Sequence, residues 1–288
     1  MMTLLLLATL MAACTGKDHH AGPSGSAVEG DSLVVTIDSL GIGMTLLSDR
    51  PDTVMEATVA SLLAERLFFT EYGQEPVAQP AYAGDFSQFA RDCARRKWAE
   101  MFDQTFGHYP ERATDDEEAI SRAEAVEAAA RAMREDTICA STCRAALRRV
   151  YDSDSLQSWQ FDYDIYIAQT AHPSMGTWGV TLRKRDCRPV GQLLRDTEQP
   201  AFRRLLKQRL RAWLMVEMEE PEVTDELLTG YLSETVGSVD ELPLPKLPPY
   251  LTGKGVALCY DEGELLGAVH SSVVLVLPYD KVRNYMER

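Results

Sequence analysis

The chain has 288 residues, of which 45% are hydrophobic and 25% are charged, and its formal net charge is −15 at pH 7. This length and composition are ordinary for a folded protein with one or two domains. The acidic balance excludes nucleic acid as a partner, because the phosphate backbone would repel the protein, and it is compatible with basic partners.

The first predicted element is an apolar run over residues 3–13, which ends at Cys14 and is followed by a polar stretch. A membrane-spanning helix needs about 20 apolar residues, so this run is too short to span a bilayer. Small residues before Cys14 are typical of a secretory signal, and the cysteine itself resembles the lipobox of bacterial lipoproteins, where the thiol is acylated. We therefore expect a signal peptide over 1–13, lipidation of Cys14 and a flexible tether over 14–30, with plain secretion as the alternative.

The residues up to about 110 predict a strand followed by two helices. Polar and apolar residues alternate over 32–40, as they do in a strand with one buried face. Apolar residues then recur near helical spacing over 53–69 and again over 86–106. We expect these elements to form the first of two sub-domains, over residues 31–110.

Residues 111–150 differ in character, because they are rich in Ala, Glu and Arg. The acidic run 115–118 suits a helix N-terminus, where negative charge is favourable. We expect two helices here, separated near Asp136 and Thr137. Together they predict a helical insertion over 111–154 that covers a sheet, and the alternative is an arm that binds a partner.

The second half of the chain predicts strands around one long helix. Residues 159–167 alternate strictly and, with a further strand over 178–182, predict an antiparallel pair. Residues 199–219 carry one apolar stripe opposed by a basic side, which indicates an amphipathic helix. We interpret the basic side as solvated, with docking to a membrane surface or an acidic partner as alternatives. Two final strands are expected over 256–260 and 273–277, and the fold class is therefore α+β, with antiparallel strands and packed helices.

Five cysteines remain besides Cys14, so in an oxidising compartment at least one of them stays unpaired. Cys139 and Cys143 are four residues apart, which on a helix places them on one face, where a local disulfide is conceivable. No second Cys/His pair lies at ligand spacing, so we expect no metal site. The pairing stays open among Cys93, Cys139, Cys143, Cys187 and Cys259.

The C-terminal part carries a family resemblance. The sequence Tyr-Leu-Thr-Gly-Lys-Gly-Val-Ala-Leu-Cys-Tyr at 250–260, followed by Val-Leu-Pro-Tyr-Asp-Lys-Val at 276–282, resembles the C-terminal domain of RsiV-like proteins. Residues 171–177, Ala-His-Pro-Ser-Met-Gly-Thr, resemble the loop that joins two strands in that family. The resemblance covers 155–288, and residues 31–110 are similar to the PdaC-like domain that usually precedes it.

Two segments depart from the family pattern. Gln169 and Thr170 stand where family members carry two glycines, and the segment 263–269 keeps only Glu264 and the aliphatic residue after it. Glycines and aliphatic residues at strand ends serve turns and burial, so the matching motifs indicate a fold more than a site.

The resemblance implies binding rather than catalysis, because RsiV is an anti-sigma factor whose extracellular part senses lysozyme, a basic protein. We therefore expect a non-catalytic lipoprotein of the bacterial cell envelope, in the outer membrane and facing the periplasm or the surface. Its partner would be a basic extracellular protein such as lysozyme, or an envelope polymer such as a peptidoglycan fragment. The alternatives are a hydrolase or deacetylase-associated protein acting on envelope glycans, and a structural envelope protein.

No catalytic motif supports an enzyme, since the sequence lacks a Gly-x-Ser-x-Gly elbow, a His-Glu-x-x-His pair and a phosphate-binding glycine loop. We therefore expect no catalytic residue and no cofactor. His172 with Asp162 and Asp164 is the arrangement that a metal or hydrolase site would use, but the two aspartates fall on the outward face of a strand, where solvation explains them. The candidate ligand contacts are His172, Trp178 and Glu264, although Trp178, like Trp159, suits the core.

Overall fold

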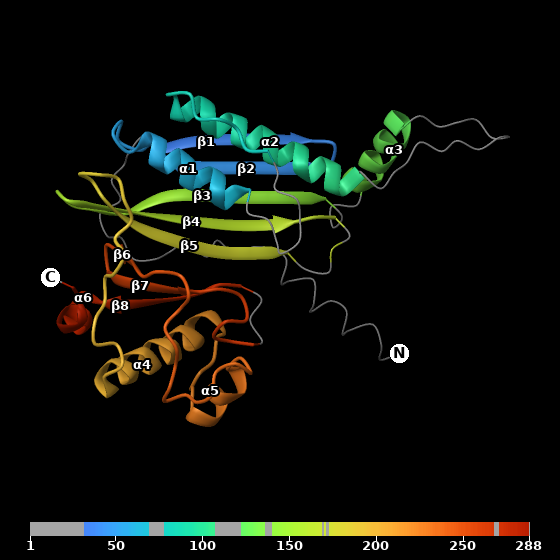
Figure 1. The fold of residues 1–288 in the computed structure, drawn as a ribbon. Helices are drawn as coiled ribbons and strands as arrows, with labels where there is room; N and C mark the ends of the chain where they lie inside the picture. Colours follow the sequence, from blue (N-terminus) through green and yellow to red (C-terminus); the bar gives the residue numbers. More distant parts are fainter. Residues whose placement is uncertain are drawn as a thin grey trace, which may run out of the picture.

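The computed structural model describes residues 32–68, 78–106, 122–135, 140–168, 170, 173–267 and 271–287. Two helices, a five-stranded sheet, a three-stranded sheet and a further helix follow one another as layers (Figure 1). This mixture of helices with mostly antiparallel strands confirms the expected α+β class. Among the described residues, no helix is long and apolar enough to cross a membrane.

The five-stranded sheet has the order β1-β2-β3-β4-β5, in which only the β2–β3 pair is parallel. The β1–β2 hairpin closes at Leu40 and Gly41, which both have positive φ (55° and 73°), as a type I′ turn requires. The parallel β2–β3 pair needs a long crossover, and the helices α1, α2 and α3 lie within it. The strands are β1 (Ser32–Ser39), β2 (Ile42–Asp49), β3 (Ser141–Asp152), β4 (Leu156–Tyr166) and β5 (Ser174–Arg183); the crossover helices are α1 (Glu56–Leu67), α2 (Phe86–Phe106) and α3 (Arg122–Glu135).

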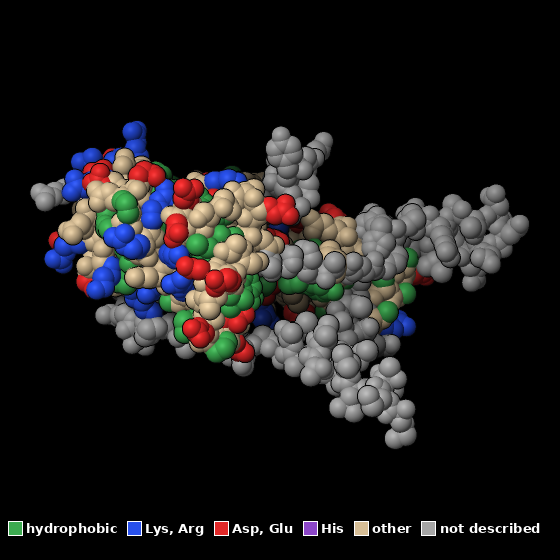
Figure 2. Space-filling view, turned by 90° about the horizontal axis from the view of Figure 1, so that it is seen from below, with side chains coloured by type: hydrophobic (Ala, Val, Ile, Leu, Met, Phe, Trp, Pro, Cys, Tyr) green, Lys and Arg blue, Asp and Glu red, His purple; other side chains and the backbone are tan. Residues whose placement is uncertain are grey.

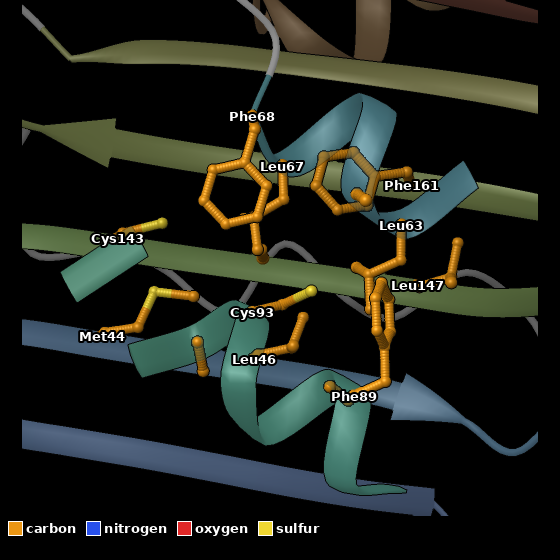
Figure 3. Close-up of a cluster of buried hydrophobic side chains, with 14 of the residues drawn as sticks. Met44, Leu46, Leu63, Leu67, Phe68, Phe89, Cys93, Cys143, Leu147 and Phe161 are labelled. Carbon is orange, nitrogen blue, oxygen red and sulfur yellow. The ribbon is translucent and has the colours of Figure 1, made fainter. Parts of the chain in front are cut away.

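Helices α1 and α2 cover one face of this sheet, which we call the helix face. Alternate strand residues point toward the helices and are buried, as expected for a pleated strand with one apolar side. Figure 3 shows the resulting core, in which side chains from β2, β3 and β4 meet those of the two helices. Its members include Met44, Leu46, Leu63, Leu67, Phe89, Cys93, Cys143, Leu147 and Phe161.

The three-stranded sheet has the order β6-β7-β8 and is antiparallel throughout. One of its faces packs on α4 through Phe202, Leu206, Leu210 and Leu214, which recur every three to four residues on one side of the helix. The other face carries Tyr250, and Tyr250 packs on the five-stranded sheet. The elements of this part are α4 (Pro200–Glu217), α5 (Asp225–Tyr231), β6 (Tyr250–Thr252), β7 (Gly255–Tyr260), β8 (Val273–Pro278), α6 (Tyr279–Val282) and a 3-10 turn (Arg283–Tyr285).

One expected helix is wrong. Residues 141–152, interpreted above as the second helix of the insertion, form strand β3. Ala and Arg favour helices, but here Cys143, Ala145 and Leu147 are buried between β2 and β4, and this tertiary packing overrides the local propensity. The first helix of the insertion is confirmed as α3. Because β3 pairs with β4, the expected domain boundary near residue 155 falls inside a hairpin and does not separate two sheets.

The cysteines show no disulfide among the described residues. Cys93, Cys143 and Cys259 are buried, and burial raises the pKa of each thiol to about 12. Cys187 is half-buried. Because Cys143 lies on a strand, the argument for a local disulfide on a helix no longer applies, and Cys139 lies outside the described residues.

Candidate binding surface on the second face of the sheet

The five-stranded sheet has a second face, which points away from α1 and α2. The three-stranded sheet covers it only in part, because Tyr250 and its neighbours pack on β4 and β5 toward one end of these strands. Strand register aligns the remaining side chains in rows that cross the sheet. One row is Val34, Leu47, Ala146, Asp162 and Thr177; the next is Thr36, Thr45, Arg144, Asp164 and Met175.

We call the uncovered part the open sheet face and define it by Val34, Thr36, Asp38, Thr45, Leu47, Arg144, Asp164 and Met175. Val34 is 61% exposed although it is apolar, and Thr36, Asp38 and Arg144 are exposed too. Thr45 and Leu47 are half-buried by their neighbours in the rows. Three of these side chains, Val34, Thr36 and Thr45, are β-branched.

The boundary between the covered and open parts is a polar network around Asp162. One carboxylate oxygen of Asp162 accepts from the Thr177 hydroxyl at 2.9 Å, and both accept from the Gln160 amide at 2.9 and 3.0 Å. Arg148 adds an ion pair at 3.3 Å. The Tyr250 hydroxyl donates to Gln160 Oε1 at 3.1 Å, and burial raises the pKa of that hydroxyl well above its ordinary value. Asp162 is thus engaged as the common acceptor of a structural network.

Close backbone contacts fix the two sheets to each other beside this network. The Thr177 N–H donates to Ser272 Oγ at 3.0 Å, and the Cys259 thiol donates to the Thr177 carbonyl at 2.8 Å. A Cβ built on Gly179 would lie 2.3 Å from the Tyr250 ring, so only glycine lets the ring approach. The cover over this half of the face is therefore tightly packed.

The candidate ligand residues named from the sequence differ in their burial and in their contacts. Trp178 is 7% exposed and lies in the core, where the Arg66 guanidinium covers its ring at 4.1 Å from the centroid. It is not available to a ligand, and the interpretation of Trp159 and Trp178 as core residues is confirmed. Glu264 accepts from the N–H groups of Lys246 at 2.7 Å and Asp261 at 2.9 Å, so it organises a turn.

Two further residues, His172 and Cys14, lie outside the described residues. The aspartates that were considered with His172 do lie on the outward face of β4, as the alternation predicts. Within the described part of the chain, no group of three His, Cys, Asp or Glu side chains is arranged to hold a metal ion.

The basic side of α4 is occupied by acidic side chains of the protein itself. Lys207 contacts Asp225 at 2.9 Å and Asp240 at 2.8 Å, and hydrogen bonds to Asp240 and Asp225 raise the pKa of Lys207. Arg211 also pairs with Asp225. Figure 2, seen from the side of α4 and α5, shows acidic and basic side chains interspersed. Lys207 and Arg211 of the basic side are therefore paired within the protein itself.

Two hollows lie on the opposite side of the molecule from the open sheet face. One, of about 460 Å³, is lined by α2 and the segment before it, including Asp92, Arg95 and Arg96. The other, of about 310 Å³, lies where α1 and α2 begin and includes Glu56 and Asp85.

Two solved structures of DUF3298 family proteins are similar to this chain. One, from Bacteroides fragilis NCTC 9343, shares 15% identity over 90% of this chain and 93% of its own, with a TM-score of 0.49. The other, from Pseudomonas aeruginosa PAO1, shares 11% identity over 89% of this chain and 94% of its own, with a TM-score of 0.48. No family model and no curated protein matches the chain. DUF3298 is a domain of unknown function, so these neighbours bring no activity or ligand to the site.

Proposed function

We propose that the protein is a non-catalytic binding protein of the bacterial cell envelope, held by a lipid on Cys14, and that its open sheet face binds a basic extracellular protein such as a lysozyme. The RsiV-like motifs of residues 155–288 and the PdaC-like character of 31–110 support a binding role. The observation that carries the proposal is the solvent-exposed part of the second sheet face, with exposed Val34 at its edge.

The shape of this face suits a protein better than a small molecule. Small ligands bind in concave pockets, and the two hollows described above are lined by other residues than those of the open sheet face. Five strands about 4.8 Å apart give it a width of about 20 Å, and a stable interface needs about 800 Å² on each partner. The neighbouring β-branched and polar side chains Thr36, Thr45 and Arg144 give such an interface both contact area and hydrogen-bonding groups.

Charge favours a basic partner. The chain carries a net charge of −15, and Asp38 and Asp164 place two carboxylates on the open sheet face itself. Arg144 lies directly opposite Asp164 across the β3–β4 pair, but the structure gives no ion pair between these two described residues. Asp164 therefore retains its capacity to pair with a cation of the partner, and long-range attraction would speed the encounter.

Calorimetric titration with a lysozyme tests the proposal. Replacing both Asp38→Lys and Asp164→Lys should weaken binding at least ten-fold and reduce its salt dependence, because exposed interfacial charges act on encounter and affinity. Asp103→Lys, an exposed carboxylate on α2, is the matched control and should change affinity less than two-fold. No lysozyme binding by the unmodified chain, or equal losses in test and control variants, would reject the proposal, and binding of peptidoglycan fragments alone would reassign the ligand.

A further inference from the structure

We infer that the free edge of strand β1 pairs with β1 of a second copy of this chain, so that two five-stranded sheets join into one antiparallel sheet across a two-fold axis at Val35. This inference concerns the strand edge and does not depend on the partner proposed for the open sheet face.

Strand β1 is the outermost strand of the sheet (Figure 1). Its hairpin closes on the pair Ser39 and Ile42 with a two-residue turn, so hydrogen-bonded pairs with β2 alternate from that pair along the strand. The backbone groups of Val34, Thr36 and Asp38 consequently point away from β2. Among the described residues, none of these three has a backbone hydrogen-bond partner on that side.

This edge has few of the features that protect edge strands. Natural sheets blunt their edges with Lys, Pro, bulges or very short strands. β1 has eight residues, contains neither Lys nor Pro, and pairs with β2 without a register shift. Its one charged residue is Asp38. An unprotected edge of this length is a template for another strand.

Apolar side chains flank the edge on both faces of the sheet. Val34 is 61% exposed on the open sheet face. Val35 and Ile37 are only partly buried on the helix face, although they pack against the core below α2. Pairing with another strand would remove these three side chains from water, and this adds a hydrophobic contribution to the new hydrogen bonds.

The sequence of β1 is complementary to itself in one register. With Val35 opposite Val35 of the second copy, Leu33 lies opposite Ile37, so the helix face pairs only apolar residues. On the open sheet face Val34 lies opposite Thr36, and the outward backbone groups of these two residues coincide. Self-complementarity of this kind is what a two-fold interface requires, and it favours a second copy over an unrelated strand.

The two neighbouring registers of the β1–β1 pair place less complementary side chains opposite each other. Centring the axis on Thr36 places the Asp38 carboxylate opposite Val34 and Leu33 opposite Ser39. Centring it on Val34 leaves Asp38 and Ile37 without opposite residues within the strand. The Val35 register instead places Asp38 opposite Ser32 and keeps the two Asp38 carboxylates at opposite ends of the paired strands, which limits repulsion between them.

Cysteine crosslinking of the full-length chain tests both the pairing and its register. Opposite residues in a non-hydrogen-bonded antiparallel pair have Cα atoms about 4.5 Å apart, which is within the range for a disulfide. Val35→Cys should therefore give a covalent dimer on mild oxidation with oxidised glutathione, at least ten-fold faster than Val34→Cys or Thr36→Cys and than the unmodified chain, which controls for the native cysteines. Faster crosslinking of Val34→Cys or Thr36→Cys, or none with any of the three, would overturn the register or the pairing.

Light scattering on the full-length chain provides the second measurement. The unmodified chain should have a molar mass near twice 32.1 kDa. Thr36→Pro removes an outward N–H without touching the ladder to β2 and should weaken dimerisation at least ten-fold, while Thr36→Val keeps the N–H and should remain dimeric. Circular dichroism establishes that both variants are folded. A monomeric unmodified chain, a Thr36→Pro variant that is folded and dimeric, or capture of a different protein at β1 by a monomeric chain would overturn the inference.

Discussion

The two faces of the five-stranded sheet are covered in different ways. The helix face is packed along its length by α1 and α2, and its side chains are apolar and buried. The second face is divided: the three-stranded sheet covers part of β3, β4 and β5, and the open sheet face lies beside this cover. Neighbouring residues of one strand, such as Leu46 and Leu47, therefore experience very different surroundings. The contrast shows that position in the strand, rather than residue type, decides which side chains are buried in the core and which remain partly exposed.

The largest expected effect is a difference in the free energy of unfolding between variants of these two leucines. Leu46 is fully buried on the helix face, so Leu46→Ala should lower the free energy of unfolding by about 2–5 kcal/mol, through lost burial and the cavity left behind. Leu47 is half-buried on the open sheet face, and Leu47→Ala should cost less than about 1 kcal/mol. Urea denaturation of both variants measures the difference. Equal losses would contradict the assignment of the two faces.

A second comparison uses two glycines of the second face. Gly179→Ala should destabilise the protein by about 1–3 kcal/mol, because the new Cβ meets the Tyr250 ring at 2.3 Å and the two sheets must move apart. Gly43→Ala is the control on the open part, where the nearest atom lies at 3.9 Å on Thr142, and it should change stability by less than about 0.5 kcal/mol. Thermal unfolding distinguishes them, and a tolerated Gly179→Ala would show that the sheets are not in tight contact.

A smaller effect on stability is expected in the polar network around Asp162. Asp162→Ala removes the acceptor of Gln160, Thr177 and Arg148, and it should cost about 1–2 kcal/mol of stability because half-buried donors lose their partner. Asp164→Ala, two residues along the same strand, should change stability by less than about 0.5 kcal/mol. If chemical denaturation gives the reverse order, the network is not what joins the sheets.

The smallest expected effect concerns thiol reactivity. Cys93, Cys143 and Cys259 are buried with pKa values of about 12, so at pH 8 they are protonated and inaccessible. Cys187 is half-buried and should react first with a maleimide among these four. Mass spectrometry of the labelled peptides gives the order. Above pH 9 stability should fall, because the unfolded thiols ionise near their ordinary value whereas the folded ones do not until about 12.

Much of the fold could be predicted from periodicity. The alternation at β1 and β4 and the helical spacing of α1, α2 and α4 are properties of the sequence itself, and each of these elements is present. Strand β2 was missed, because Leu46 and Leu47 interrupt its alternation of apolar and polar residues. Strand β3 was taken for a helix, because its Ala and Arg residues favour one. Its pairing partners lie outside any local window: the residues of β2 that it pairs with are 99 positions earlier, and those of β4 are 5 to 24 positions later.

The candidate site could be predicted only in part. Alternation correctly placed Asp162 and Asp164 on an outward face, and it placed Trp178 in the core. Alternation could not predict which part of that face is covered, because the residues that cover it, Tyr250 and its neighbours, lie far along the chain. The rows that join Thr36 and Thr45 to Arg144 depend on the parallel β2–β3 pairing, which local sequence does not encode.

Amide hydrogen exchange of the chain, alone and with saturating lysozyme, tests most directly whether the open sheet face is the binding surface. Binding there should slow exchange in β1, β2 and β3 at least ten-fold and leave α2 and α4 unchanged. Protection confined to α4, to β6–β8 or to the helix side, or no protection at all, would contradict the account.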